Sequence, residues 1–279
     1  MHVIETVAAF AHARAALVGD LGLVPTMGYL HAGHLALVAQ ARRENSCVAV
    51  SIFVNPTQFA AHEDLARYPR DLPRDLAMLE QAGVDLVFVP PPAVIYPPHF
   101  ATSIDVGRVA VPLEGAARPG HFAGVATVVC KLCNITRATR AYFGQKDAQQ
   151  TLVIRRMAID LNLPTAIVIC PTVREPDGLA LSSRNVYLSH AQRTAAPILY
   201  RALCAAAAHY QHGERVAARL RNLVEQTIAS EPLAQLEYIS VADRENLHEL
   251  DMISSAGALV SLVVRFGNTR LLDNILLSD

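Results

Sequence analysis

Two histidines in the segment Val24-Pro-Thr-Met-Gly-Tyr-Leu-His-Ala-Gly-His-Leu-Ala-Leu37 are the most specific chemical feature of this sequence. His31 and His34 stand three residues apart where a strand is predicted to end and a helix to begin. Imidazoles at this spacing share one helix face, and the N–H groups and partial positive charge of a helix N-terminus attract phosphate. Gly28 and Gly33 allow a nucleotide to approach the backbone. The alternative is a glycine turn with two solvent-facing histidines, which the preceding strand makes less favoured.

Two later segments carry positive charge beside small or polar residues. Phe143-Gly-Gln-Lys-Asp-Ala-Gln-Gln150 places Lys146 at a second predicted helix start, where its point charge suits β- and γ-phosphate oxygens. Asp147 could cap the same helix. Leu181-Ser-Ser-Arg-Asn185 offers two hydroxyls and a guanidinium, which match phosphate or charge developing on it. Taken alone, this last segment is more typical of an ordinary loop.

Neutral amides are the third feature. Ser51-Ile-Phe-Val-Asn-Pro-Thr-Gln-Phe59 leaves an apolar strand and presents Asn55 and Gln58 at its carboxyl end, and Gln150 follows one turn into the helix after Lys146. Uncharged amides in such places suit a small substrate with hydroxyl and carboxylate groups.

Acidic candidates for Mg²⁺ are Asp75 and Glu114, since Mg²⁺ bound with ATP takes few protein ligands. A solvated carboxylate on a helix face is the stronger interpretation of Asp75. His121, in the loop Arg118-Pro-Gly-His-Phe122, could be catalytic, but a capping or structural role is favoured.

The elements that must position these residues alternate along the first two thirds of the chain. Strands are predicted at 21–25, 46–54, 85–89, 141–143 and 166–170, and helices at 34–43, 71–82, 122–135 and 147–162. This alternation predicts an α/β fold with a doubly wound, Rossmann-like parallel sheet. Ligands of such sheets bind beyond the carboxyl ends of the strands, where the motifs above lie.

The pattern changes after residue 173. Long helices are predicted at 189–211 and 214–228, followed by strands at 236–241, 258–266 and 270–277. Helices first and strands afterwards indicate a second, smaller α+β domain. We therefore expect a nucleotide- and substrate-binding domain over 1–175 and a C-terminal domain over 176–279.

Composition limits the functional classes. The 279 residues are 52% hydrophobic and 18% charged, with a net charge of −1 and no basic block, so neither a nucleic-acid surface nor an anionic-membrane anchor is expected. No spanning helix or signal peptide is predicted, which indicates a soluble cytoplasmic protein. Cys130 and Cys133 form a C-x-x-C, for which buried helix thiols are favoured over a redox or zinc site because no second ligand pair follows.

Taken together, the motifs resemble the pantothenate synthetases, the pantoate–β-alanine ligase family of the nucleotidylyltransferase superfamily with its HIGH-type signature. The resemblance rests on segments spread in order over most of the first 190 residues: 25–34, 51–59, Tyr68-Pro-Arg70, 118–125, 143–147, Gln149-Gln150 and Ser182-Ser-Arg-Asn185. Their joint occurrence is far more specific than any one of them.

The resemblance implies that pantoate is first adenylated by ATP and that β-alanine then displaces AMP to give pantothenate. It assigns ATP binding to Met27, Gly28, Tyr29, Leu30, His31, Ala32, Gly33, His34, Gly144, Gln145, Lys146, Asp147, Val173, Leu181, Ser182, Ser183 and Arg184. Of these, His31, His34, Lys146 and Arg184 are the catalytic candidates. Gln58, Gln150 and Asn55 would bind substrate, and Asp75 would help hold Mg²⁺. A homodimer with the C-terminal domain as a lid is also implied.

Three other functions fit parts of the sequence. A nucleotidylyltransferase acting on a phosphate ester would favour an additional basic cluster, whereas Gln58 and Gln150 are neutral. A nucleotide-binding protein without catalysis is disfavoured by the full set of phosphate-binding groups. A serine hydrolase is weaker still, because no G-x-S-x-G elbow surrounds Ser182 or Ser183.

Overall fold

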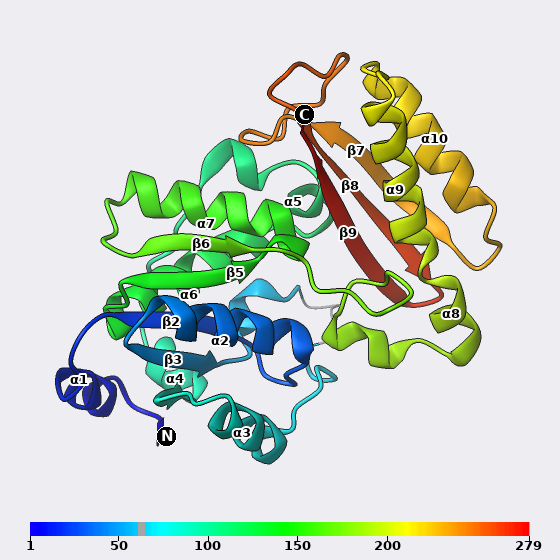
Figure 1. The fold of residues 1–279 in the computed structure, drawn as a ribbon. Helices are drawn as coiled ribbons and strands as arrows, with labels where there is room; N and C mark the ends of the chain where they lie inside the picture. Colours follow the sequence, from blue (N-terminus) through cyan, green and yellow to red (C-terminus); the bar gives the residue numbers. More distant parts are fainter. Residues whose placement is uncertain (61–64, 279) are drawn as a thin grey trace. The chain divides into compact units, whose positions relative to one another are not determined.

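A computed structural model describes residues 1–60 and 65–278 of the chain (Figure 1). The chain divides into two compact units, each with its own hydrophobic core. Unit 1 comprises Met1–Gly144 and Gln149–Pro171, and unit 2 comprises Gln145–Ala148 and Thr172–Asp279. The short segment around Lys146 is thus packed with the C-terminal part of the chain.

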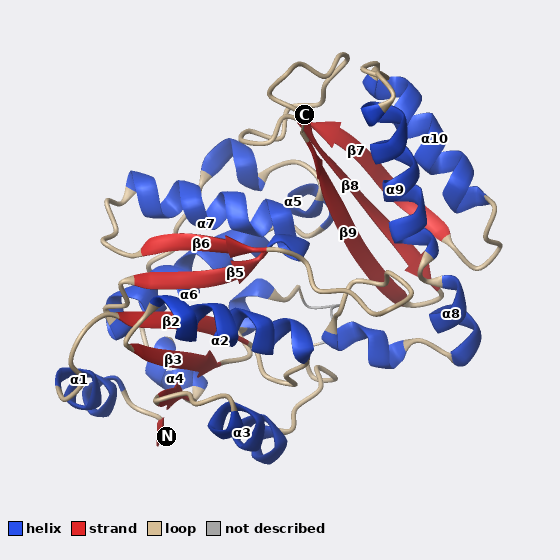
Figure 2. Cartoon of the chain, in the orientation of Figure 1, coloured by secondary structure: helices blue, strands red, loops and turns tan. Residues whose placement is uncertain are grey.

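Unit 1 is built on a six-stranded parallel sheet of order β1-β4-β3-β2-β5-β6 (Figure 2). Its strands are β1 His2–Ile4, β2 Leu21–Thr26, β3 Cys47–Ile52, β4 Leu86–Phe88, β5 Arg140–Gly144 and β6 Ala166–Cys170. Alternate residues along β2 pack into two different cores, Leu21 and Leu23 into one and Val24 into the other. A sheet buried on both faces is expected to have continuous apolar strands, as this one does. The predicted doubly wound fold is confirmed.

Helices cover this sheet, and most lie where the apolar periodicity predicts them. They are α1 Val7–Ala15, α2 Ala32–Glu44, α3 Leu72–Gln81, α4 Pro92–Ile95, α5 Glu114–Ala117, α6 His121–Thr136 and α7 Ala148–Asp160. Short 3₁₀ turns η1 Pro56–Gln58, η2 Gly107–Ala110 and η3 Gln145–Asp147 lie in the connections. The sequence analysis did not predict β1, α1, α4 or α5. β1, α4 and α5 are only three or four residues long and therefore too short to show a period, and α1 buries only Phe10.

Unit 2 pairs helices with a three-stranded antiparallel sheet of order β7-β8-β9. Its elements are η4 Ser183–Tyr187, α8 His190–Ala195, α9 Ile198–Gln211, α10 Ala217–Ala229, β7 Gln235–Ala242, β8 Ala258–Phe266 and β9 Thr269–Leu277. The single helix predicted over 189–211 is wrong, because it is divided before α9 at Pro197. Proline lacks the N–H that a continuous helix needs there and clashes with the preceding turn.

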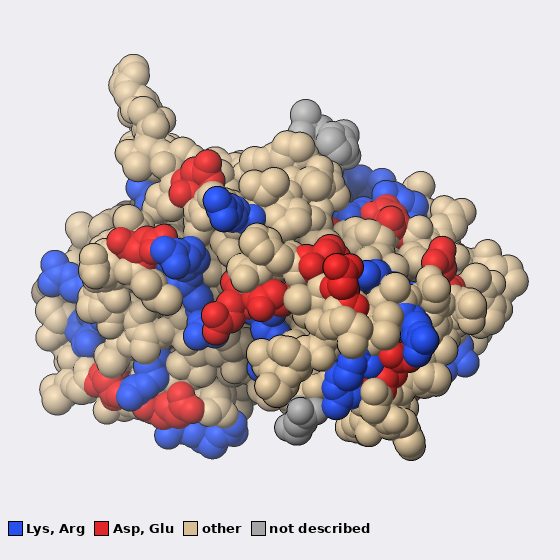
Figure 3. Space-filling model, turned by 90° about the horizontal axis from the view of Figure 1, so that it is seen from above, with Lys and Arg blue, Asp and Glu red and all other residues tan. Residues whose placement is uncertain are grey.

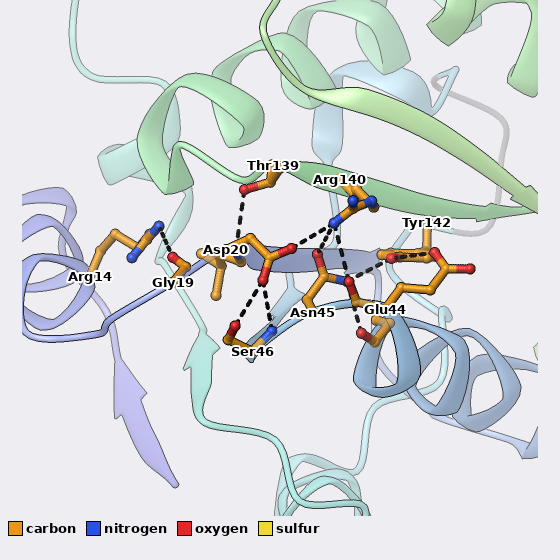
Figure 4. A network of polar contacts seen from close by, with 11 residues as sticks. Arg14, Gly19, Asp20, Glu44, Asn45, Ser46, Thr139, Arg140 and Tyr142 are labelled. Atoms are coloured by element: carbon orange, nitrogen blue, oxygen red, sulfur yellow. Dashed lines mark hydrogen bonds and ion pairs between the residues drawn. The ribbon is translucent and has the colours of Figure 1, made fainter.

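The amino ends of β2, β3 and β5 are tied together by a polar network (Figure 4). Asp20 accepts hydrogen bonds from Ser46 N at 2.8 Å and from Arg140 Nη1 at 2.7 Å. Asn45 donates to the Tyr142 hydroxyl at 2.6 Å. This network lies at the sheet edge opposite the strand ends that precede the predicted nucleotide motifs.

Charged side chains of both signs intermingle on the face seen in Figure 3. Within residues 1–60 and 65–278, no helix is long and apolar enough to cross a membrane.

Candidate active site

The turn after β2 is held by one buried carboxylate. Asp75, only 1% exposed, accepts hydrogen bonds from the backbone N–H of Tyr29 at 2.7 Å and of Leu30 at 2.8 Å. Gly28 and Tyr29 both adopt positive φ, +85° and +52°. A Cβ at position 28 would lie 3.2 Å from Asp75 Oδ2, so glycine satisfies both the conformation and the close approach.

Asp75 lies in the first turn of α3, and its neighbour Arg74 also contacts the turn after β2. Arg74 donates to Leu30 O at 3.1 Å, and its guanidinium carbon lies 5.4 Å from the centre of the Tyr29 ring. Burial raises the pKa of the Asp75 carboxyl, while the two backbone N–H groups and then Arg74 act in the opposite direction. Two consecutive residues of α3 therefore fix the turn that leads into the histidine motif.

His31 and His34 form a reciprocal cap at the start of α2. His31 Nδ1 accepts from Gly33 N at 3.2 Å, and His34 Nδ1 accepts from His31 N at 3.3 Å. The ring centres lie 4.0 Å apart. Because both Nδ1 atoms are acceptors, each neutral ring carries its proton on Nε2. The arrangement presents two Nε2–H donors on one helix end, where backbone N–H groups already favour an anion.

Asn55 is the buried centre of the amide cluster. It is 1% exposed, donates to Gln58 Oε1 at 3.0 Å and to Gly124 O at 3.1 Å, and accepts from the Tyr96 hydroxyl at 2.8 Å. These bonds occupy both ends of its amide with protein groups. Asn55 thus fixes the η1 turn and the orientation of Gln58. The sequence analysis did not identify Tyr96, which lies 41 residues away from Asn55 with no motif around it.

Gln58 is held from several sides while its amide stays half-buried. Its Nε2 lies 3.6 Å from Met27 Sδ, which brings Asn55 and Gln58 next to the turn after β2. The backbone carbonyl oxygen of Gln58 lies 2.9 Å from His121 Nδ1 and accepts a hydrogen bond from Arg118 Nη2 at 3.3 Å. His121 therefore contacts the backbone of the Gln58 turn, in agreement with the structural role favoured for it.

The two glutamines at the start of α7 differ in their contacts. Gln149 is buried and bonded to Val109 O at 3.0 Å, Pro112 O at 2.7 Å and Glu114 N at 3.0 Å. The amide of Gln150, by contrast, has no hydrogen-bond partner among the described residues. Gln149 is thus a structural residue, and Gln150 is the amide available to a ligand. Glu114, the second acidic candidate, is buried in the first turn of α5.

Unit 2 brings together the remaining phosphate-binding candidates. Lys146, Ser182 and Arg184 line one small pocket of this unit. Ser182 caps η4, since its Oγ accepts from Arg184 N at 3.2 Å. Val173 O accepts from Leu181 N at 3.0 Å, so the two ends of this segment lie together directly before Ser182.

The described residues form no metal site from protein groups alone. Within 1–60 and 65–278, no group of three or more His, Cys, Asp or Glu side chains could hold an ion. Both Asp75 oxygens already accept backbone N–H groups, and Arg74 stands beside it, so Asp75 does not fit a direct Mg²⁺ ligand. Cys130 and Cys133 are free thiols on α6, and burial raises the pKa of Cys133 to about 12, which disfavours the reactive thiolate.

Comparisons with known proteins identify the family of this chain. The model of the family described as pantoate-beta-alanine ligase matches residues 2–276. The pantothenate synthetase of Roseiflexus castenholzii is 63% identical over 277 residues, covering 99% of this chain and 99% of that protein. A crystal structure of the Thermus thermophilus enzyme has a TM-score of 0.95 at 49% identity, covering 100% of both chains. The Francisella tularensis ligase, solved with β-γ ATP and β-alanine, has a TM-score of 0.80 at 36% identity, covering 99% of this chain and 97% of that one.

Proposed function

We propose that this chain, which belongs to the pantoate–β-alanine ligase family, joins pantoate and β-alanine to form pantothenate at the expense of ATP. The pantoate carboxylate attacks the α-phosphorus of ATP, and the bond to the leaving pyrophosphate breaks. The β-alanine amine then attacks the acyl carbon of the pantoyl adenylate, loses a proton and expels AMP. ATP is thus a substrate, and pantoate and β-alanine are the other two.

The paired histidines carry this proposal. Their Nδ1 atoms accept the N–H groups of the α2 cap, so each neutral ring offers an Nε2–H donor. Negative charge grows on phosphate oxygens during adenylation, and fixed donors stabilise it without reorganising. His34, as the candidate proton donor, and His31 would supply this stabilisation in unit 1, and Lys146 and Arg184 in unit 2.

The remaining ATP-binding candidates surround these four side chains in the sequence. They are Met27–Leu30, Ala32 and Gly33 before and within α2, Gly144, Gln145 and Asp147 after β5, and Val173 and Leu181–Ser183 in unit 2. The backbone hydrogen bond from Leu181 N to Val173 O supports a shared role of these two residues in binding ATP.

Pantoate is assigned to Gln58 and Gln150. The first is oriented by Asn55 and the second has no competing partner among the described residues, so both amides suit the hydroxyl and carboxylate groups of pantoate. Gln58 is also the candidate nearest to β-alanine. Asn55, although it remains a substrate-binding candidate, acts here through Gln58.

Mg²⁺ is assigned to the nucleotide rather than to a protein cage. Mg²⁺ with ATP keeps several waters and is held largely by phosphate oxygens. Asp75 is instead a positioning residue for the Gly28–Leu30 turn, because its two oxygens bind the turn's N–H groups. We also propose that the protein is a cytoplasmic homodimer. Its nucleotide- and substrate-binding domain would span 1–175 and its C-terminal domain 176–279.

A product assay tests the function directly. The protein is incubated with MgATP and pantoate, with and without β-alanine, and AMP and pantothenate are followed by mass spectrometry. AMP and pantothenate should accumulate only when both acids are present. Nucleotide binding without any AMP would favour a non-catalytic protein, and AMP transfer to another acceptor would place the substrate assignment in error.

A further inference from the structure

Strand β9 contains two adjacent buried polar residues in an otherwise largely apolar run. Asp273 is 2% exposed and Asn274 is 4% exposed. Buried polar groups need hydrogen-bond partners. Apart from the Asn274 N–H, which donates to Asp273 Oδ1, the partners of these two side chains lie outside the sheet. Each of the two side chains reaches a different segment that carries nucleotide-binding candidates of unit 2.

Asn274 binds the backbone around Lys146. Its Nδ2 donates to Gln145 O at 3.0 Å and to Lys146 O at 2.8 Å, and its Oδ1 accepts from Gln145 Nε2 at 3.1 Å. One amide therefore fixes two consecutive peptide carbonyls of η3. The direction in which Lys146 leaves the backbone depends on this contact.

Asp273 holds the second segment through an ion pair. Its carboxylate binds the Arg174 guanidinium in a bidentate manner, at 2.6 and 2.9 Å. The same guanidinium donates to Gly178 O at 3.1 Å and lies 3.9 Å from the centre of the Tyr200 ring. Arg174 also pairs with Ala180 in an isolated bridge, two residues before Ser182. The segment over 174–184 is thus held against β9 by the contacts of Arg174 with Asp273 and Ala180.

We propose that Asp273 and Asn274 are positioning residues that hold Lys146 in register with Ser182 and Arg184 for the ATP phosphates. The same pocket is lined by Lys146, Ser182, Arg184 and Asp273. The segment around Lys146 and the segment over 174–184 therefore meet beside β9. Donors fixed before the reaction are effective because misplacement by about 1 Å can cost about 10²-fold in rate. This positioning role rests on the proposed function, in which Lys146 binds ATP.

A double-mutant cycle with Lys146→Ala tests this role. Asn274→Asp keeps the shape of the side chain but cannot donate to the two carbonyls. We expect it to lower kcat/KM for ATP by about 10- to 100-fold in the otherwise native protein. In the Lys146→Ala background the same change should lower kcat/KM by less than about 3-fold, because the group being positioned is already absent.

The matched control is Ser261→Ala, directly across from Asn274 on β8. Ser261 Oγ is buried and has no hydrogen-bond partner among the described residues, so this variant should keep native kcat/KM. Asp273→Asn should likewise lower kcat/KM for ATP. The matched control is Asp160→Asn, which breaks the exposed Asp160–Arg156 pair at the end of α7 and should leave kcat/KM unchanged. Thermal midpoints are measured for every variant, and Asn274→Ala replaces Asn274→Asp in the cycle if the latter does not fold.

The kinetic results distinguish failure of the positioning role of Asn274 from failure of the assignment of Lys146 to ATP. An Asn274 variant with native kcat/KM, or with equal losses in both backgrounds, would overturn the positioning role. A Lys146→Ala variant as active as the native protein would instead overturn the assignment of Lys146 to ATP. Losses that vanish in the Lys146→Ala background would support both.

Discussion

The Gly28–His34 turn of unit 1 and the Lys146 segment of unit 2, both proposed to bind phosphate, have backbones that are fixed in two different ways. The first is fixed largely from within, by the reciprocal histidine cap, and from outside by Asp75. The second is a short 3₁₀ turn fixed by Asn274, which lies 128 residues after Lys146. A local motif is therefore sufficient to identify the first segment, whereas the geometry of the second depends on a distant strand.

Removal of the His34 imidazole should give the largest effect. His34→Ala deletes both the proposed phosphate donor and half of the cap, so the adenylation rate should fall by about 10²-fold or more. Single-turnover formation of pantoyl adenylate measures this step. Near-native adenylate formation would contradict the role of His34, and His12→Ala, on α1 away from the motif, serves as the control.

Asp75→Asn tests the external support of the same turn. The amide retains one acceptor but turns its NH₂ group toward the second backbone N–H, so one charge-assisted bond is lost, about 1.5–3 kcal/mol in typical cases. We expect kcat/KM for ATP to fall by about 10-fold, with a smaller change in KM for β-alanine. Initial rates with each substrate varied in turn measure the difference.

A direct Mg²⁺ ligand at position 75 would behave differently. Activity of the Asp75→Asn variant would then recover as the Mg²⁺ concentration rises, whereas a positioning residue predicts no such recovery. A magnesium titration of the variant and the native protein therefore decides between the two roles.

Gln58→Ala should separate substrate binding from both phosphate segments. Its amide is assigned to pantoate, so KM for pantoate should rise by about 10-fold while KM for ATP changes little. Asn55→Ala should produce a similar rise because Asn55 orients Gln58. A loss confined to ATP binding would contradict the assignment of this pocket.

The smallest effect is expected at the opposite edge of the sheet, where the polar network of Figure 4 lies. Hydrogen bonds from Ser46 N and then Arg140 lower the pKa of Asp20 from 3.8 to about 2. A lowered pKa means that the unfolded chain binds the proton more tightly. The stability supplied by Asp20 is thus present above pH 3.8 and is lost as the pH falls toward 2.

Urea unfolding of the native protein and of Asp20→Asn measures this contribution. The difference in unfolding free energy between them should shrink between about pH 5 and pH 2, since the Asn variant lacks the titrating group. KM for ATP at neutral pH should be unchanged. A constant difference over this pH range would rule out the ionised Asp20 as the source of the stability.

The doubly wound sheet and the order of its motifs could be predicted from the amino-acid sequence. Continuous apolar strands such as β3 and periodic helices such as α2 report burial through neighbours a few residues away, so they can be identified without coordinates. The His31–His34 spacing is equally local, and the helix cap it forms involves only four consecutive residues. Weak or short signals were missed, as at β1 and at the break before α9.

The packing of the fold determines which of the polar candidates are hydrogen-bonded to other parts of the protein. Asp75 reads as a solvated or metal-binding acid in the sequence, yet folding buries it against N–H groups 45 and 46 residues away. Gln149 and Gln150 are identical neighbours that the helix turns into different surroundings. Asp273 and Asn274 acquire their partners only when β9 meets η3 and Arg174. A side chain's role follows from the groups that satisfy it, and long-range packing chooses those groups.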